Sequence, residues 1–169
     1  LPWVPQARDW IAQALALRFE AIATVYATSA RTLPAPLMAL REGPEAPAQF
    51  VFDRGQLLGR SQWGLLACVV SDSSGTREAL EQQVVAQLQE QMREQLQEQL
   101  QVVQTVVEKR ATFVCSPGLQ RPPSAIGPGW WACGDYVAGP YPATLEGAVR
   151  SGREVIDQIA QTRERERRL

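Results

Sequence analysis

Histidine and asparagine are both absent from the 169-residue chain, and Lys109 is its only lysine. The lack of histidine excludes Ser-His-Asp and Cys-His hydrolysis, HExxH zinc sites and histidine-containing zinc fingers. A P-loop is excluded as well, because no glycine-rich loop precedes Lys109. Any chemistry at this chain must therefore use other groups.

Cysteine is scarce, with only Cys68, Cys115 and Cys133. Their number is odd and no pair has CxxC spacing, which argues against a disulfide framework or a metal site. We expect all three to be buried thiols in a reducing compartment rather than redox groups.

Neither charge sign dominates, since 17 Lys and Arg face 18 Asp and Glu and the net charge is −1. Without an overall positive field, nucleic acid is not expected as a partner. No apolar run approaches the roughly 18 residues of a membrane span, and no signal pattern opens the chain. We expect a cytoplasmic protein. The basic run 163–168 is expected to be a solvated helix end, and peripheral contact with anionic lipid of the inner membrane is the alternative.

The first part of the chain predicts a mostly antiparallel sheet. A weak helical period over 6–18 precedes strand-like runs at 21–28, 49–53 and 65–71, which have hairpin spacing. A further strand is predicted at 105–115. Together with the helices, these strands predict the α+β class.

A long polar helix is predicted at 76–101. Its apolar residues recur at four-residue steps and are Leu80, Val84, Leu88, Met92, Leu96 and Leu100. Such a stripe favours an amphipathic helix with one face on the sheet. A partner-binding coiled coil, and with it a non-catalytic interaction module based on this glutamine-rich helix, is the alternative.

The motif that carries chemistry follows a Pro- and Gly-rich loop. A short strand at 130–133 leads through Gly134-Asp135 and a compact turn into a helix at 144–162. A carboxylate at the end of a strand can accept hydrogen bonds from polyol hydroxyls, although Asp135 could also cap a turn. The free N–H groups near Leu145 suit a group that gains negative charge. Gly147 and Gly152 allow a close approach to a sheet or a ligand.

Residues 134–152 resemble the C-terminal FAD-binding motif of the flavin amine oxidase and phytoene desaturase superfamily, in which Gly-Asp precedes a Glu-Gly-Ala-x-x-Ser-Gly helix. Other segments are similar to the hydroxysqualene dehydroxylase family, the squalene-associated FAD-dependent desaturases of bacteria, and these are 22–26, 33–38, 50–55, 109–113, 115–118 and 121–122. The sequence departs from that pattern at Trp130, Trp131 and Cys133, and in the repetitive helix around residues 89–100.

The resemblance implies the C-terminal portion of a two-domain FAD-dependent amine oxidase-like fold. Residues 1–115 would be part of the substrate-binding domain, and 116–169 the C-terminal FAD-binding segment. The implied cofactor-binding residues are Gly134, Asp135, Tyr141, Pro142, Thr144, Leu145 and Gly147. No catalytic residue and no metal ligand is implied. Tyr136 and Tyr141 would either line the flavin or pack, and Glu146 and Arg150 are expected to form an ordinary helical ion pair.

The implied activity is that of an FAD-dependent oxidoreductase that converts hydroxysqualene, a long-chain isoprenoid, to squalene for hopanoid synthesis. A carotenoid-type desaturase or an amine oxidase is the alternative within the superfamily. The chain lacks the GxGxxG loop of the family's Rossmann unit, so a missing N-terminal portion of the same protein is the expected partner, and the fragment alone is expected to be inactive. The side chains expected to be exposed for that portion are Trp130, Trp131, Leu145, Val149 and Ile156.

Overall fold

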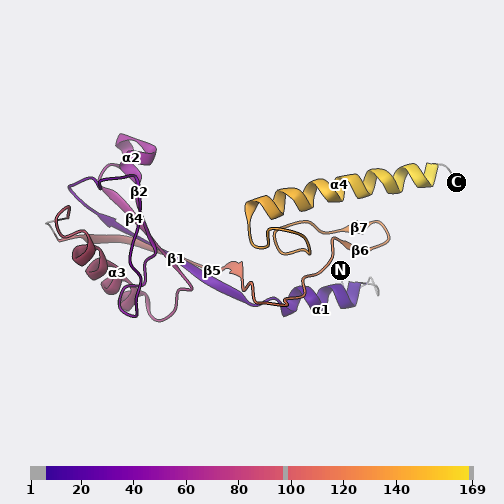
Figure 1. Cartoon of the computed structure of the whole chain (residues 1–169), viewed down its shortest axis with the longest axis horizontal. Coiled ribbons are helices and arrows are strands. Elements are labelled where there is room, and N and C mark those ends of the chain that lie inside the picture. The colour runs from indigo at the N-terminus through magenta and orange to yellow at the C-terminus, as the bar shows by residue number, and fades with distance from the viewer. Residues whose placement is uncertain (1–6, 97–98, 168–169) are drawn as a thin grey trace. The chain divides into compact units, whose positions relative to one another are not determined.

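A computed structural model describes residues 7–96 and 99–167 (Figure 1). The chain combines helices with an antiparallel sheet, as the α+β prediction stated, and divides into two compact units. The sheet unit is Glu20–Ala111, and the terminal unit joins the described residues up to Phe19 with those from Thr112 onward. The sequence-based boundary at 115 differs from this division, because the first helix packs with the C-terminal segment rather than with the sheet.

The sheet unit is built on five strands in the order β2-β3-β4-β1-β5. Their bounds are β1 Phe19–Thr28, β2 Leu37–Ala39, β3 Phe50–Asp53, β4 Leu65–Ser71 and β5 Gln101–Phe113. The pairs β2–β3, β3–β4 and β1–β4 are antiparallel. The predicted strands are confirmed, whereas β2 was missed because only three residues follow a proline-rich stretch. The strands β2, β3 and β4 form the meander, and β1 lies beyond β4.

The helix α3 spans Arg77–Gln91 and is shorter than the predicted 76–101. The Thr76 hydroxyl caps its start by accepting the Ala79 N–H at 3.3 Å. The chain turns after Met92, and β5 already begins at Gln101. The helix ends before its propensity alone would end it, because β5 must begin at Gln101 to pair beside β1, and tertiary pairing overrides helix propensity.

The core of the sheet unit lies between α3 and one face of the sheet. Inward residues of β1 alternate with less buried ones, at Ala23, Val25 and Ala27. All six residues of the predicted apolar stripe are buried, including those beyond the end of α3. The stripe therefore serves the unit's own core, which favours the amphipathic interpretation over the coiled coil.

Two glutamines of α3 fasten a loop to the helix. Gln87 is buried, accepts the Ala48 N–H at 2.8 Å, and donates to the carbonyls of Ala48 and Arg41 at 2.8 and 3.0 Å. One turn later, Gln91 accepts the Arg41 N–H and donates to the Arg41 carbonyl. The two side-chain amides thus satisfy the backbone N–H and carbonyl groups of Arg41 and Ala48, which no neighbouring strand among the described residues pairs with.

The terminal unit contains α1 Arg8–Ala16, β6 Ala125–Gly127, β7 Trp130–Trp131 and α4 Leu145–Arg167. The predicted strand 130–133 is shorter and pairs with β6, which was not predicted. The helix predicted at 144–162 is longer. The Trp10 indole N–H donates to the Pro123 carbonyl at 2.7 Å, which ties α1 to this unit.

The expectation of three buried thiols is wrong for two of them. Cys68 is buried on β4, and burial raises its pKa to about 12. Cys115 and Cys133 are exposed, because both lie in irregular segments outside the sheet unit's core. In the described part of the chain, no helix is both long and apolar enough to cross a membrane.

Candidate functional site

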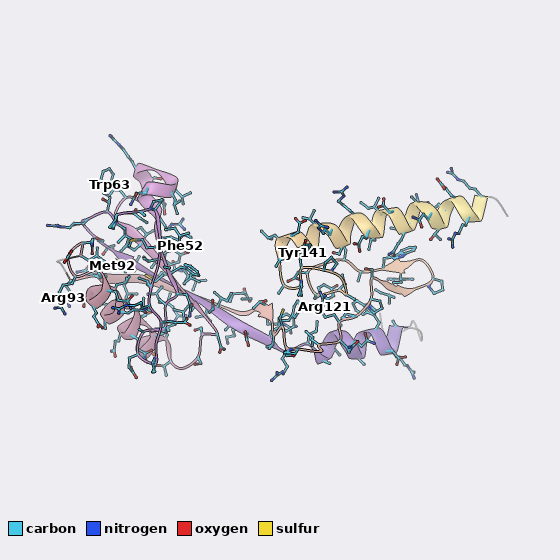
Figure 2. The ribbon with its side chains drawn as sticks, in the orientation of Figure 1. Phe52, Trp63, Met92, Arg93, Arg121 and Tyr141 are labelled. Carbon is cyan, nitrogen blue, oxygen red and sulfur yellow. The ribbon has the colours of Figure 1, made fainter. Side chains whose placement is uncertain are left out.

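The loop between β7 and α4 carries most of the predicted site residues, and Arg121 shapes it. The Arg121 guanidinium donates to the carbonyls of Val137 at 2.6 Å and Asp135 at 3.4 Å, and also to that of Gly139. Figure 2 shows Arg121 within the loops of this unit. One planar donor group thus gathers three carbonyls and fixes the curve of the loop that presents Asp135.

The end of the β7 segment is fastened to α4 by one hydroxyl. Ser151 accepts the Gly134 N–H at 2.9 Å, and its own proton lies within reach of the carbonyls of Gly134 and Ala148. Ser151 is buried. The Gly134-Asp135 turn is therefore held against the second turn of the helix.

The start of α4 is capped by Thr144. Its hydroxyl accepts the Gly147 N–H at 3.0 Å and donates to the Tyr141 carbonyl at 2.7 Å, while the Ala148 N–H donates to the Thr144 carbonyl. Among the described residues, no acceptor faces the N–H groups of Leu145 and Glu146. These two amides are available donors at the positive end of the helix dipole.

Gly147 faces the backbone of the preceding loop. A Cβ at this position would clash with the Tyr141 carbonyl oxygen and lie 3.4 Å from that of Pro140. Tyr141 and Ala143 have φ values of 58° and 55°, a left-handed conformation that costs non-glycine residues energy. Gly147 thus has a close neighbour, but it is the preceding loop and not the predicted sheet or ligand, and a Cβ at Gly152 would meet nothing within 4 Å.

Asp135 is half-buried, and its carboxylate makes no hydrogen bond or ion pair among residues 7–96 and 99–167. The turn-capping alternative is therefore not supported. The Asp135 carbonyl accepts the Ala143 N–H at 3.4 Å, which brings the turn close to the start of α4. The carboxylate is left available for a ligand.

The two tyrosines have different roles. Tyr136 packs edge-on against Trp10, with ring centres 6.4 Å apart. Burial, followed by the charges of Cys133 and Asp135, raises the Tyr136 pKa. Tyr141 is exposed, and the Arg150 guanidinium lies 4.9 Å from its ring centre.

The helical ion pair is confirmed, with 2.5 Å between Arg150 Nε and Glu146 Oε1. Of the predicted site residues, Gly134, Asp135 and Gly147 line one small hollow, which Arg150 and Ser151 also border. Pro142 instead lines a neighbouring hollow with Cys115 and Arg121. The Leu145 side chain is exposed to solvent, so only its backbone N–H can bind a ligand in the hollow.

Several apolar side chains of the terminal unit are exposed, as the sequence predicted. Trp130, Leu145, Val149 and Ile156 are exposed, and Trp131 is half-buried. Leu145, Val149 and Ile156 recur along α4 at helical spacing, so they form one apolar strip. The prediction is confirmed for all but Trp131.

The sheet face opposite α3 carries apolar residues that the sequence analysis did not single out. Direct strand partners share a face, and two such rows run across the sheet: Leu37, Phe52, Ala67 and Tyr26, then Ala39, Phe50, Val69 and Thr24. Leu37 and Phe50 are exposed, and Phe52 is half-buried. The sequence feature that could have predicted this face is the alternation in β3. Val51 and Asp53 point into the core, whereas Phe50 and Phe52 point to the opposite face of the sheet.

The fold of this chain is similar to that of a known structure, although its sequence matches no family model. No family model and no curated protein matches the chain. The arrangement of helices and strands is similar to part of one solved structure. The solved structure concerned is an oxidoreductase from Methanosarcina mazei, with a TM-score of 0.61 and 13% sequence identity. The match covers 90% of this chain and 37% of that one, so this chain spans little more than a third of its neighbour's length.

Proposed function

We propose that this chain forms the C-terminal part of an FAD-dependent oxidoreductase and that its loop 134–147 contributes to the flavin site. The observation that carries the proposal is the Asp135 carboxylate. It has no partner among the described residues, yet Arg121 and Ser151 fix the loop around it beside the start of α4. Its fixed backbone and available carboxylate fit a ligand rich in hydroxyl groups.

The residues present fit the flavin part of FAD. Asp135 would accept hydrogen bonds from a ribityl hydroxyl, and the N–H groups of Leu145 and Glu146 would face the N1–C2=O edge. When bound, FAD supplies hydride transfer at its N5 atom. The start of α4 favours negative charge at that edge by about 1 kcal/mol, which stabilises the reduced form.

The apolar sheet face supports a long-chain isoprenoid as the substrate. Among the residues of its two rows, Tyr26 alone is titratable, and Phe50 and Phe52 offer wide apolar surfaces. Such a face can cover a hydrocarbon chain, and the Arg54 guanidinium, 5.6 Å from the Tyr26 ring centre, would repel the ammonium group of an amine there. We therefore favour conversion of hydroxysqualene to squalene, as the sequence resemblance implies, with a carotenoid-type desaturase as the second candidate.

The expected partner of the terminal unit is an N-terminal FAD-binding portion of the same protein. Leu145, Val149 and Ile156 give α4 an exposed apolar strip that such a portion would cover. Gly152 lies on the same helix with open space around it.

The test of the flavin site uses the full-length gene product and the ratio of flavin to protein absorbance. We expect Asp135→Ala to lose most bound FAD, because a charged acceptor's hydrogen bonds contribute roughly 1.5–3 kcal/mol. Asp157→Ala, on the exposed side of α4, is the matched control and should retain FAD. Wild-type FAD content in Asp135→Ala would contradict the site.

The substrate test incubates the purified protein with hydroxysqualene, phytoene or a primary amine. Squalene formed only with reduced flavin supports the dehydroxylase. Desaturated phytoene or an aldehyde under oxidising conditions assigns the protein to one of the alternatives. Substituting Phe52 by serine should raise KM for an isoprenoid substrate with little change in FAD content.

A further inference from the structure

The connection between β3 and β4 forms a small protruding tip, residues 54–63. It consists of α2 Arg54–Leu58 and the short helix η2 Arg60–Gln62. Figure 1 shows α2 at the margin of the sheet unit, and Figure 2 shows Trp63 beside it. The exposed fractions are 49% for Leu57, 59% for Leu58 and 63% for Trp63. Three large apolar side chains are thus presented to solvent within seven consecutive residues.

Hydrogen bonds of the flanking polar residues hold the backbone of the tip in the conformation that exposes these side chains. The buried Asp53 carboxylate caps α2 by accepting the Gln56 N–H at 3.1 Å. The Gln56 side chain donates to the Leu33 carbonyl at 2.8 Å, and the Arg54 Nε donates to Gln62 Oε1 at 3.1 Å. The exposure of the apolar residues is therefore a fixed feature of the local fold.

The tip is basic within a chain whose net charge is −1. It carries the exposed Arg60 and the half-buried Arg54, whose guanidinium lies over the Tyr26 ring, and no acidic residue occurs from residue 54 to residue 71. The exposed Arg31 belongs to the neighbouring loop, because the Ser29 N–H donates to the Gly64 carbonyl at 2.8 Å. The nearest acid in sequence, Asp53, is buried. The surface that complements this charge is anionic.

We propose that the tip docks on an anionic lipid surface. Leucine side chains at a protruding turn can enter the boundary between headgroups and acyl chains, and tryptophan prefers the headgroup level. Arginine adds attraction to lipid phosphates, about 1 kcal/mol for each residue near the surface, or about fivefold in partitioning. In this arrangement Leu57 and Leu58 enter the boundary, Trp63 lies at its level, and Arg60 faces the phosphates. The proposal does not depend on the flavin site.

The test is co-sedimentation of the full-length gene product with two kinds of vesicle, phosphatidylglycerol mixed with phosphatidylcholine and phosphatidylcholine alone. We expect binding to the anionic vesicles only. The double variant Leu57→Ser with Leu58→Ser should lower partitioning about tenfold or more, since it removes two apolar side chains. Arg60→Gln should lower it about fivefold.

Two control variants match these substitutions. Leu15→Ser changes an exposed leucine of α1, and Arg165→Gln changes a basic residue of the C-terminal run. Both should bind as the unchanged protein does. Quenching of tryptophan fluorescence by brominated lipid should fall in Trp63→Phe.

Three results would overturn the proposal. The first is equal sedimentation with neutral vesicles or without vesicles. The second is loss of binding in Arg165→Gln but not in Arg60→Gln. The third is that the unchanged chain binds another protein without vesicles and the tip variants do not. FAD content is measured on the same preparations and should not change in the tip variants. A failure of the flavin proposal would appear there and leave the vesicle result unaffected.

Discussion

Gly147 and Gly152 lie five residues apart on α4, and only Gly147 meets another part of the described chain. An added Cβ at Gly147 would clash with the Tyr141 carbonyl, whereas one at Gly152 would contact nothing within 4 Å. The same substitution should therefore have opposite effects at the two positions.

We expect Gly147→Ala to destabilise the terminal unit and Gly152→Ala to stabilise it by about 0.4–1 kcal/mol, because alanine restricts the unfolded chain more than glycine does. Urea unfolding of the full-length protein, followed by circular dichroism, measures both. Gly152→Ala serves as the control for Gly147→Ala. A destabilised Gly152→Ala would reveal a partner surface packed tightly on that position.

Arg121→Lys should loosen the loop 134–139. A lysine ammonium cannot reach the three carbonyls that the guanidinium spans, and hydrogen bonds to charged groups contribute roughly 1.5–3 kcal/mol each. We expect faster amide hydrogen exchange at Ala138, whose N–H binds the Pro122 carbonyl, and a several-fold weaker retention of FAD. Arg153→Lys, exposed on α4, should change neither measurement.

Asp53 makes the stability of the sheet unit depend on pH. Burial alone would raise its pKa, but hydrogen bonds from the Gln56 side chain and from the Leu33 and Gln56 amides hold the pKa below the ordinary 3.8. A lowered folded-state pKa stabilises the fold above pH 3.8, and this contribution is lost as pH falls through the folded-state value.

The unfolding free energy of the wild type should therefore exceed that of Asp53→Asn at neutral pH, and the difference should shrink as pH falls below about 4. Glu45→Gln, an exposed change in the same unit, is the control. A difference that stays constant through this acid range would contradict the assignment.

Gln87 and Gln82 offer a matched pair on α3. Replacing Gln87 by alanine leaves the buried Ala48 amide and carbonyl without their partner, which typically costs about 1–3 kcal/mol for each unsatisfied group. Gln82 is exposed, so Gln82→Ala should change the unfolding free energy by no more than about 0.5 kcal/mol. Equal effects of the two substitutions would show that the loop 41–48 does not depend on α3.

The three thiols should react at different rates. Cys115 and Cys133 are exposed, whereas Cys68 is buried with a pKa of about 12, so little thiolate forms at neutral pH. A colorimetric thiol reagent should label two cysteines quickly and the third only in denaturant. Rapid labelling of Cys68, shown by Cys68→Ala, would mean that β4 opens readily.

The strands and the final helix could be predicted because they depend on local patterns. The run 65–71 became β4 with the predicted bounds, since its apolar and β-branched residues need no distant contact to indicate a strand. The end of α3 could not be predicted, because the pairing of β5 beside β1 decides where the chain turns. Likewise, sequence spacing indicated Asp135 and Gly147, but the role of Arg121 arises from carbonyls 14 to 18 residues away.

The terminal unit is assembled from two segments that are distant in sequence, and this has a consequence for the order of folding. Trp10 and Pro123, which it joins by a hydrogen bond, are 113 residues apart. Closing so long a loop in an unfolded chain is entropically unfavourable. Once the sheet unit has formed, β1 and β5 are neighbours. The two strands lead directly into the terminal unit, where the Val114 N–H donates to the Arg18 carbonyl at 2.9 Å. With this pair closed, only eight residues separate Trp10 from Arg18 and nine separate Val114 from Pro123. We therefore expect α1 to pack after the sheet unit has folded, with little further loss of chain entropy.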